Sequence, residues 1–240
     1  IPGFSSKETG LVTNANSMWL NDKPFKKDLE TALKREVKLM NDANCFTLSE
    51  AVDGAGKDYQ SIFGIIVGTG FGGALSYKKE IIEGANQIAG DWGHQPLPYP
   101  TKEEIETKIN CPSMNCGRTL CAEQFMSGIG FKDVFNQKNN TNFSSEEIVQ
   151  LDLDGDPRAN LELSLYEDRM ARLMAVMIGI FDPDAIILGG GMSNIDRLYK
   201  NIPALIPKYT FSNKVITKVI KNFHGDSSGV RGAAWLWNHV

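Results

Sequence analysis

The chain has 240 residues, which is enough for one large or two small domains with a substantial buried core. Apolar residues make up 42% and charged residues 22% of it, a composition typical of globular proteins and not of disordered or fibrous ones. With 25 Lys and Arg against 29 Asp and Glu, the net charge of −4 argues against nucleic acid as a partner and favours small molecules.

The first predicted elements are two helices with a short strand between them. From Pro24 on, apolar residues at every fourth position predict an amphipathic helix that includes Phe25, Leu29, Leu33 and Val37. Residues 37–40 then alternate as a strand does, and a second helical run passes through residues 48–52. Asp42 is therefore predicted at a strand end and helix start, where a carboxylate projects toward the crevice of an open α/β sheet.

A glycine-rich segment lies between the next two predicted strands, residues 62–67 and 74–79. It reads Gly68-Thr69-Gly70-Phe71-Gly72-Gly73, and we interpret it as a hairpin whose backbone N–H groups grip a phosphate, with the Thr69 hydroxyl as a further donor. The same residues fit the dinucleotide fingerprint G-x-G-x-x-G, although that motif opens a helix. A glycine turn without a ligand is the third interpretation.

Helix signals dominate the following part of the chain. Ser144 with Glu147 predicts a capping box, and Asp156-Pro157 predicts the start of the next helix. In that long helix, apolar side chains follow a 3.6-residue period and are assigned to the core: Tyr166, Met170, Leu173, Met174, Met177 and Phe181.

A second glycine cluster follows another predicted strand. Residues 184–188 form this strand, which leads into Gly189-Gly190-Gly191 and then into a helix. One more strand at 215–220 and a closing helix after Gly229 complete the chain.

One histidine and three cysteines gather within 28 positions: His94, Cys111, Cys116 and Cys121. Four nitrogen and sulfur ligands are what tetrahedral structural zinc prefers. The spacings are not C-x-x-C pairs, so buried cysteines and a hydrogen-bonded histidine stay the alternative. Cys45 lies apart on an apolar helix and is assigned to packing.

No segment of the sequence indicates a membrane span or a secretion signal. The longest apolar runs are far shorter than the roughly 20 residues of a spanning helix, and Ile1-Pro2-Gly3 lacks the pattern of a signal peptide. Four cysteines are also too few and too clustered for a disulfide scaffold. We therefore expect no membrane partner and a reducing, cytoplasmic setting.

Six motifs, in order along nearly the whole chain, resemble the ROK family (repressor, open reading frame, kinase). They are Asn41-Asp42-Ala43-Asn44, the hairpin 68–73, and the segments 89–94, 116–123, 188–191 and 225–233. Segments 14–17 and 92–98 look most similar to bacterial fructokinases that also accept mannose. The resemblance implies an α/β fold of the actin-like (ribonuclease H-like), two-lobed sugar kinase type, with ATP between the lobes.

The resemblance also implies how the chain divides. Residues 1–44, with the closing helix of 225–240 packed back on them, would form the remainder of an incomplete N-terminal lobe, and residues 45–224 the C-terminal lobe. The family's opening strand and its Asp-x-Gly-x-Thr phosphate loop normally precede the Ile-Pro-Gly segment. A fuller protein would then be the enzyme, with activity impaired in the chain alone, and a homodimer is expected.

By position, Asp42 corresponds to the family's catalytic base, which accepts the proton of the attacking hydroxyl. The expected reaction is the ATP-dependent phosphorylation of fructose, or of mannose, at its 6-hydroxyl. Asn41 would hold the sugar beside the base. The resemblance places further sugar contacts at Gly3, Asn16, Asp91, His94 and Glu123.

The two glycine clusters have separate roles in the resemblance. The hairpin residues Gly68, Thr69, Gly70, Gly72 and Gly73 are similar to the family's second phosphate loop, and Gly189, Gly190 and Gly191 to its nucleoside-side loop. ATP and Mg²⁺ are the implied cofactors. Structural Zn²⁺ on His94, Cys111, Cys116 and Cys121 would stiffen the loop that carries His94 and Glu123 into the sugar pocket.

The chain departs from the family pattern at three positions. Met114 stands where the zinc loop usually has its first cysteine, so Cys111 would have to replace that ligand, and Leu120 stands where glycine is usual. Asp91 replaces the usual glutamate, and its shorter side chain should shift a contact with a sugar hydroxyl.

Three alternatives to a fructokinase stay open. One is an N-acetylhexosamine or glucose kinase of the same family, and another is a sugar-responsive ROK transcriptional repressor. Asp42 and the glycine hairpin favour a kinase over a repressor, which needs neither a base nor phosphate loops. The third, a nicotinamide oxidoreductase, would be excluded if the loop at Gly68 closes a hairpin.

Overall fold

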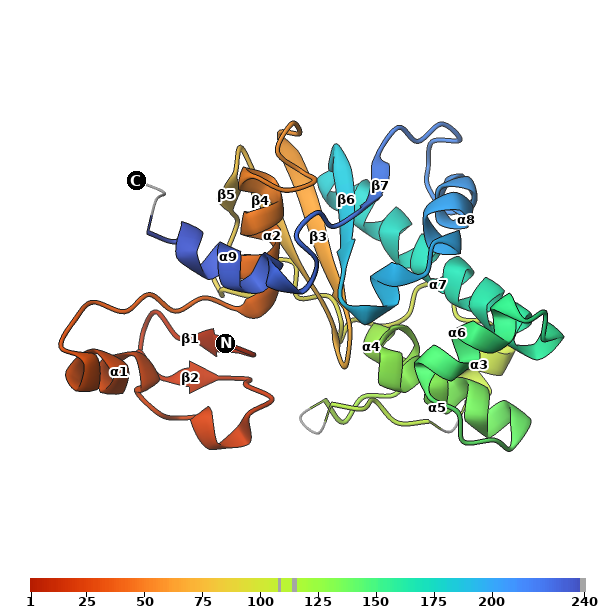
Figure 1. Cartoon of the computed structure of the whole chain (residues 1–240), viewed down its shortest axis with the longest axis horizontal. Coiled ribbons are helices and arrows are strands. Elements are labelled where there is room, and N and C mark those ends of the chain that lie inside the picture. Colours follow the sequence, from red (N-terminus) through yellow and green to blue (C-terminus); the bar gives the residue numbers. More distant parts are fainter. Residues whose placement is uncertain (108, 114–115, 238–240) are drawn as a thin grey trace.

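A five-stranded sheet forms the centre of the computed structural model, which describes residues 1–107, 109–113 and 116–237 (Figure 1). The strand order is β5-β4-β3-β6-β7. The strands are β3 (Ser61–Val67), β4 (Phe71–Tyr77), β5 (Glu80–Ile81), β6 (Ala185–Gly189) and β7 (Lys218–Lys221). Strands β3, β6 and β7 are parallel, whereas β4 and β5 are antiparallel to their neighbours. The carboxyl ends of β3, β6 and β7 therefore meet at one edge of the sheet.

Helices cover both faces of this sheet. On one face, α2 (Asp42–Val52) and α9 (Ser228–Trp235) pack together, and Gly232 of α9 lies so close to the Cys45 backbone that no side chain would fit between them. The other face carries the longest helix, α7 (Pro157–Phe181), together with α4 (Ala122–Met126), α5 (Gly128–Asn139), α6 (Ser145–Leu153) and α8 (Arg197–Leu205). No helix among the described residues is both long and apolar enough to cross a membrane.

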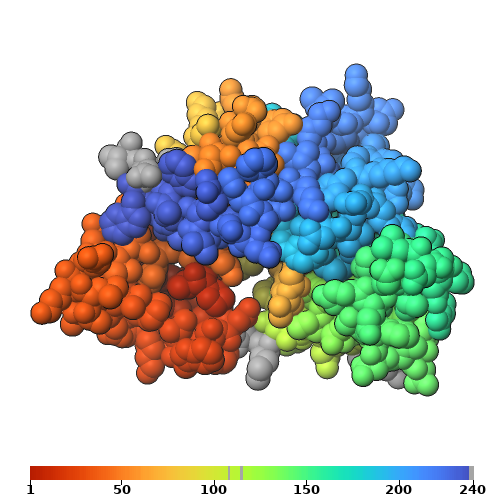
Figure 2. Space-filling model, viewed as in Figure 1, coloured from red at the N-terminus to blue at the C-terminus, as the bar shows by residue number. Residues whose placement is uncertain are grey.

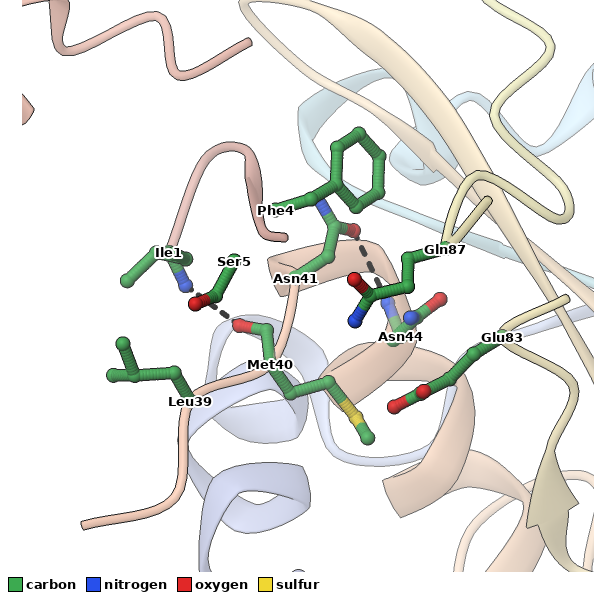
Figure 3. Close-up of a pocket in the computed structure, with 9 residues that line it drawn as sticks. All are labelled: Ile1, Phe4, Ser5, Leu39, Met40, Asn41, Asn44, Glu83 and Gln87. Atoms are coloured by element: carbon green, nitrogen blue, oxygen red, sulfur yellow. Dashed lines mark hydrogen bonds between the residues drawn. The ribbon is translucent and has the colours of Figure 1, made fainter. Parts of the chain in front are cut away.

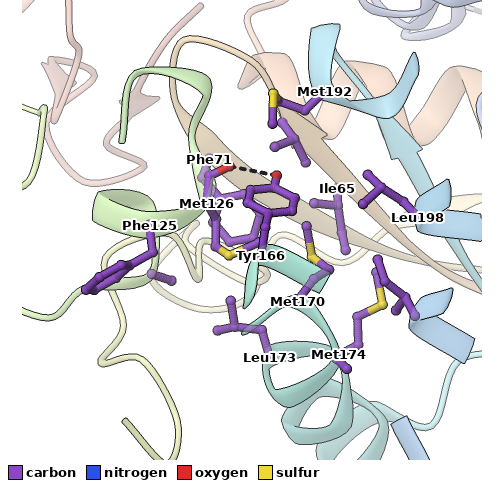
Figure 4. Close-up of a cluster of buried hydrophobic side chains, with 14 of the residues drawn as sticks. Ile65, Phe71, Phe125, Met126, Tyr166, Met170, Leu173, Met174, Met192 and Leu198 are labelled. Carbon is purple, nitrogen blue, oxygen red and sulfur yellow. Dashed lines mark hydrogen bonds between the residues drawn. The ribbon is translucent and has the colours of Figure 1, made fainter. Parts of the chain in front are cut away.

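Successive side chains of β3 and β6 point to opposite faces of the sheet, and each face packs into its own hydrophobic core. Ile62, Ala185 and Ile187 join Phe46 and Ala51 of α2 in the smaller core. The residues between them face the larger core, which includes the predicted apolar stripe of α7 that runs from Tyr166 through Met170 and Met174 to Phe181 (Figure 4 shows part of it). There the buried Tyr166 hydroxyl donates to the Met126 carbonyl over 2.9 Å, so its burial leaves no unpaired donor. The assignment of this stripe and of Cys45, which is 6% exposed, to packing is confirmed.

The N-terminal segment stands apart from the sheet (Figure 1). It holds the two-residue antiparallel strands β1 (Phe4–Ser5) and β2 (Val12–Thr13) and the predicted helix, α1 (Phe25–Leu33). Helix α1 ends before Val37 because Lys34 takes a left-handed conformation. These elements are short, and two paired residues per strand give little stability by themselves.

The strand predicted at residues 37–40 is wrong. The segment is not part of any sheet, and among the described residues no strand lies alongside it. Instead, the Ile1 backbone nitrogen donates to the Met40 carbonyl over 2.8 Å, and the Asp42 N–H donates to the Ile1 carbonyl over 3.1 Å. Two such hydrogen bonds to one residue do not make a ladder, so the apolar alternation alone gave the wrong element.

The other local predictions are confirmed with small shifts. Both capping predictions hold at the starts of α6 and α7. Strand β4 begins at Phe71, so Gly72 and Gly73 belong to the strand and the loop is only Gly68, Thr69 and Gly70. Strand β7 spans Lys218–Lys221 and so begins later than the predicted 215–220, and α9 begins at Ser228, just before Gly229.

Helix α3 (Lys102–Glu106) lies between Pro100 and Pro112, where no helix is predicted from the sequence. Its Glu104, 3% exposed, accepts from Arg169 over 2.8 Å and from Arg172 over 2.7 Å, and both arginines belong to α7. This five-residue helix is held by partners more than sixty positions away, and no local pattern in the sequence predicts these ion pairs.

Candidate functional site

Two glycine loops meet at the carboxyl edge of the sheet. The loop Gly68–Gly70 follows β3, and Gly190 follows β6, its parallel neighbour. Gly190 has a φ of +81°, and a Cβ there would lie 2.5 Å from the carbonyl oxygen of Val67. Only glycine allows the two loops to lie this close. The structure therefore brings together the residues predicted for phosphate and for nucleoside.

The loop after β3 closes an antiparallel hairpin, as predicted. Val67 pairs with Phe71, and the Gly68 N–H donates to the Gly70 carbonyl over 3.0 Å. The dinucleotide-binding interpretation is wrong because a strand, not a helix, follows the glycines. The Gly128 N–H, at the start of α5, donates to the Gly68 carbonyl over 2.7 Å, so α5 holds the loop in place.

Asp42 is the first residue of α2 and is exposed to solvent. Asn41 caps the helix, with Oδ1 accepting from the Ala43 N–H over 2.9 Å and from the Asn44 N–H over 3.4 Å. Asp42 Oδ1 also accepts from the Ala43 N–H, which places a carboxylate at the positive end of the helix dipole. A Cβ on Gly72 would lie 3.9 Å from that of Ala43, so this helix start lies directly beside the hairpin.

The predicted sugar residues of the N-terminal segment meet at the same helix start. Asn41 Nδ2 lies 3.5 Å from the Gly3 carbonyl, and the Asn16 N–H donates to the Pro2 carbonyl over 3.2 Å. Gly3 has a φ of +143°, and a Cβ there would lie 2.7 Å from the Ala15 Cα. The structure thus brings Gly3, Asn16 and Asn41 together, with the Asn16 residue exposed.

Glu123 lies beneath the hairpin on the other side of the site. It belongs to the first turn of α4, is 6% exposed, and accepts from the Phe71 N–H through Oε2 over 3.1 Å. Its own N–H donates to the Gly93 carbonyl over 2.7 Å. Glu123 therefore joins the hairpin to the loop that carries Asp91 and His94.

Asp91 lies within electrostatic range of charged groups on both sides of the site. Although the residue is exposed to solvent, the protein around its carboxyl removes part of its hydration, which raises its pKa. A positive charge on His94 opposes this shift, and the carboxylate of Asp42 adds to it. Asp42 and His94 thus both lie close enough to Asp91 to affect the ionisation of its carboxyl. In the space-filling view, the N-terminal segment and the hairpin with α4 stand on two sides of a hollow (Figure 2).

The predicted metal ligands converge. The ligand atoms of His94, Cys111, Cys116 and Cys121 all lie within 4.8 Å of one another, and Cys111 Sγ is 3.9 Å from His94 Nδ1. Ligands about 2.0–2.3 Å from a tetrahedral zinc ion stand roughly 3.5–4 Å apart, so the cluster fits such an ion after small adjustments. Burial raises the pKa of the Cys111 and Cys121 thiols, a cost that a divalent cation would offset by stabilising thiolates.

The departures from the family pattern in this loop have structural counterparts. Leu120 has a φ of +58°, a left-handed conformation that suits the glycine usual at this position. Cys111, the expected replacement ligand, lies within the cluster beside His94, and its Sγ also contacts Glu123 Oε1 over 3.7 Å. Met114 lies outside the described residues.

Sequence reasoning missed the residues that support the site. Trp92 is 6% exposed and stacks on Phe71 at 5.1 Å and 26° while meeting the edge of Phe63 at 4.7 Å. It ties the Asp91–His94 loop to both strands of the hairpin. Its position inside the family motif was the one available signal.

A small polar cavity lies behind Asn41, between the N-terminal segment and the loop after β5 (Figure 3). Asp42 does not line it, so it is adjacent to the predicted reaction centre and distinct from it. Its lining residues are Ile1, Phe4, Ser5, Leu39, Met40, Asn41, Asn44, Glu83 and Gln87.

Comparisons with known proteins agree with this architecture. The family model described as ROK family matches residues 1–240. N-acetyl-D-glucosamine kinase of Vibrio cholerae is 37% identical over 236 residues, which is 98% of this chain and 78% of that protein. A ROK family glucokinase from Streptomyces griseus, solved with glucose and AMPPNP, superimposes with a TM-score of 0.82 at 22% identity, covering 98% of this chain and 78% of that one.

A ROK family transcriptional regulator, a homologue of the E. coli MLC protein, shares the fold as well. It superimposes with a TM-score of 0.80 at 20% identity and covers 99% of this chain and 60% of that chain. At such identities the two solved structures show the shared fold alone, and they confirm the predicted two-lobed α/β fold.

Proposed function

Because the chain belongs to the ROK family, we propose that it is the greater part of a sugar kinase that transfers the γ-phosphoryl group of ATP to the 6-hydroxyl of a hexose. The observation that carries this proposal is the position of Asp42. Its carboxylate stands at the start of α2, directly beside the glycine hairpin and next to Gly3, Asn41 and Asp91. A base, a phosphate-gripping loop and hydroxyl acceptors are what such a reaction requires.

The relatives favour a different hexose from the one that the motifs suggested. The resemblance of segments 14–17 and 92–98 predicted fructose or mannose. The curated relatives at 36–37% identity are N-acetyl-D-glucosamine kinases, which supports the N-acetylhexosamine alternative. We therefore propose N-acetyl-D-glucosamine as the preferred substrate, ahead of fructose, mannose and glucose.

In the proposed reaction, Asp42 accepts the proton of the attacking hydroxyl. Its exposed carboxylate has one oxygen engaged by the Ala43 N–H, which leaves the other free to orient and deprotonate the sugar. Asp91 and Asn41 would hold neighbouring hydroxyls, since a carboxylate oxygen accepts up to two hydrogen bonds. MgATP, when bound, supplies the phosphoryl group and neutralises part of its charge.

The hairpin residues would hold the phosphates in this reaction. Backbone N–H groups of Gly68–Gly70 offer donors without a side chain in the way, and the exposed Thr69 hydroxyl adds another. Gly72 and Gly73 belong to β4. Gly73 allows close packing, because a Cβ there would lie 2.6 Å from the Phe63 ring, whereas a Cβ on Gly72 would meet only that of Ala43 at 3.9 Å. The loop Gly189–Gly191 would face the nucleoside.

We further propose that His94, Cys111, Cys116 and Cys121 hold a structural zinc ion. The ion would fix the loop around His94 and, through the first turn of α4, the position of Glu123. Glu123 in turn holds the hairpin through the Phe71 N–H. A metal at this place would therefore act on both the sugar side and the phosphate side without touching the reacting atoms.

The test is a coupled assay of ADP release with MgATP, offering N-acetyl-D-glucosamine, N-acetylmannosamine, glucose, mannose and fructose in parallel. The assay should be run on the natural protein that contains this chain. Turnover that is fastest with N-acetyl-D-glucosamine is the expected result. Absence of ADP above background with every sugar, together with measurable sugar binding, would favour the sugar-responsive repressor.

A further inference from the structure

The loop after β5 touches the N-terminal segment at a place that the proposed reaction does not use. Lys7, in the turn between β1 and β2, forms an ion pair from Nζ to Glu83 Oε2 over 2.8 Å. The Lys7 backbone N–H also donates to Gln87 Oε1 over 3.0 Å. Two contacts from one residue to two residues of one loop, about eighty positions away, join parts of the chain that are distant in sequence. We call this group, Lys7 with Glu83 and Gln87, the Lys7 bridge.

On the N-terminal side, the bridge lies at the tip of a hairpin that connects two predicted sugar residues. Strands β1 and β2 pair through Phe4 with Thr13 and through Ser5 with Val12. Gly3 directly precedes β1, and Asn16 follows β2 by three residues. Because the strands are only two residues long, the tip of the hairpin lies a short way along the chain from both Gly3 and Asn16.

On the other side, the bridged loop runs directly into Asp91. Three of its residues, Gly84, Gln87 and Gly90, have positive φ. The Ala89 N–H donates to the Glu83 carbonyl over 3.2 Å, and a Cβ on Gly90 would lie 2.7 Å from the Ala74 Cα in β4. One end of the loop is thus fixed against the sheet, and the other is held by Lys7.

We propose that the Lys7 bridge positions the two halves of the sugar site, Gly3 and Asn16 on one side and Asp91 on the other, at the separation that sugar binding requires. Lys7, Glu83 and Gln87 are positioning residues and do not touch the sugar. The inference rests on the proposed sugar site but not on phosphoryl transfer, since a sugar-responsive repressor would bind its sugar between the same residues.

The bridge should affect the sugar and spare the nucleotide. Glu83 and Gln87 line the cavity behind Asn41, whereas the hairpin at Gly68 is held by Glu123 and α5. An exposed ion pair with a supporting hydrogen bond is a weak contact, so its loss should raise the sugar KM and dissociation constant about three- to tenfold. The KM for MgATP should stay within twofold.

A charge exchange tests the proposal. Lys7→Glu and Glu83→Lys should each weaken sugar binding, measured by calorimetry with N-acetyl-D-glucosamine and by sugar KM, and the double variant should restore both to within twofold of the wild type. Gln87→Ala removes the acceptor of the backbone N–H and should weaken sugar binding without a change in charge. The matched control is the exposed pair Lys102 and Glu106 on α3, whose exchange should change nothing.

The outcomes separate the bridge from the proposed function. Single variants that bind sugar as the wild type does, or a double variant as weak as the singles, would overturn the positioning role. Equal increases in the KM for sugar and for MgATP would also overturn it, because they indicate a general loss of structure. A wild type that binds N-acetyl-D-glucosamine but releases no ADP would refute the kinase and leave the binding test of the bridge intact. Failure to bind any of the five sugars would overturn both.

Discussion

The two sides of the hollow differ in how firmly their residues are held. On the hairpin side, Glu123 is 6% exposed and accepts from the Phe71 N–H, the Gly128 N–H fixes the Gly68 carbonyl, and Trp92 packs between two aromatic rings. On the N-terminal side, the strands have two residues each and the Asn16 residue is exposed. The first side belongs to a large core, whereas the second is joined to the rest of the described chain by a few hydrogen bonds and the exposed ion pair of Lys7 with Glu83.

This difference suggests that the two sides contribute to different steps, one to phosphoryl transfer and the other to sugar binding. Phosphoryl transfer depends on exact placement of charge, which a buried and cross-braced hairpin supplies without further ordering. The more loosely held side is where a change of sugar can be accommodated at low cost in stability. We therefore expect variants on the hairpin side to act on stability and nucleotide binding, and variants on the N-terminal side to act on sugar binding.

The largest effect is expected at Asp42, which stands between the two sides. Asp42→Asn keeps the size of the side chain and removes the base, so kcat should fall about 100- to 10,000-fold while the dissociation constant for the sugar changes little. Steady-state kinetics and calorimetry on the same preparations measure the two quantities. Asp58→Asn, at an exposed position away from the site, is the control. Unchanged turnover in Asp42→Asn would refute the assignment of the base.

On the hairpin side, Gly190→Ala should destabilise the protein. The substitution puts a side chain at a φ of +81° and within 2.5 Å of the Val67 carbonyl, so the free energy of unfolding should drop by about 2 kcal/mol or more. The neighbouring Gly191 has open space around its Cβ position and no positive φ. Gly191→Ala should therefore leave the unfolding free energy within about 0.5 kcal/mol, as measured by urea denaturation. Equal losses in both variants would contradict the close approach of the loops.

Removing the metal should loosen the hairpin side selectively. If zinc is bound, a chelator should lower the melting temperature of the wild type by several degrees, because binding free energy of the metal contributes to folding. Cys121→Ser should show that loss already, and the chelator should then have no further effect. Cys45→Ala, which removes a buried thiol outside the cluster, should keep the full response to the chelator. The site would be refuted if metal analysis found no zinc in the purified wild-type protein.

Local signals in the sequence were enough to predict the glycine hairpin at the sheet edge and the starts of α6 and α7. Glycines between two strand-like runs predicted the hairpin, and the pairs Ser144 with Glu147 and Asp156 with Pro157 predicted helix starts, because each depends on neighbours in the chain. The strand at 37–40 failed because a strand also requires a partner, and its alternation says nothing about one. The convergence of His94 with Cys111, Cys116 and Cys121 was predictable from the scarcity and grouping of these residue types, whereas the metal itself stays a prediction.

Contacts between distant segments were beyond the reach of sequence patterns. Lys7 meets Gln87 eighty positions away, and Glu104 meets Arg169 and Arg172 across more than sixty. These pairs involve charged residues that occur on any solvated surface, so nothing marks them before the fold brings them together. Sequence patterns therefore named candidate residues for the proposed chemistry, which stay predictions, but they did not name the residues proposed to hold the two sides of the site in register.

The smallest predicted effect concerns the pH dependence of the contact between α9 and α2. Burial opposes ionisation of Asp53, but hydrogen bonds from Arg231 and His224 outweigh it and hold the pKa of this carboxyl below its usual 3.8. Since the folded-state pKa is the lower one, the contribution of Asp53 is complete above about pH 4 and is lost as the pH falls from there through the lowered pKa of the folded protein. The groups are partly exposed, so Asp53→Asn should lower the unfolding free energy at pH 7 by less than about 1 kcal/mol. Urea denaturation of both proteins should show this difference at pH 7 and almost none near pH 2, whereas a difference that persists in acid would mean that Asp53 acts through packing and not through its charge.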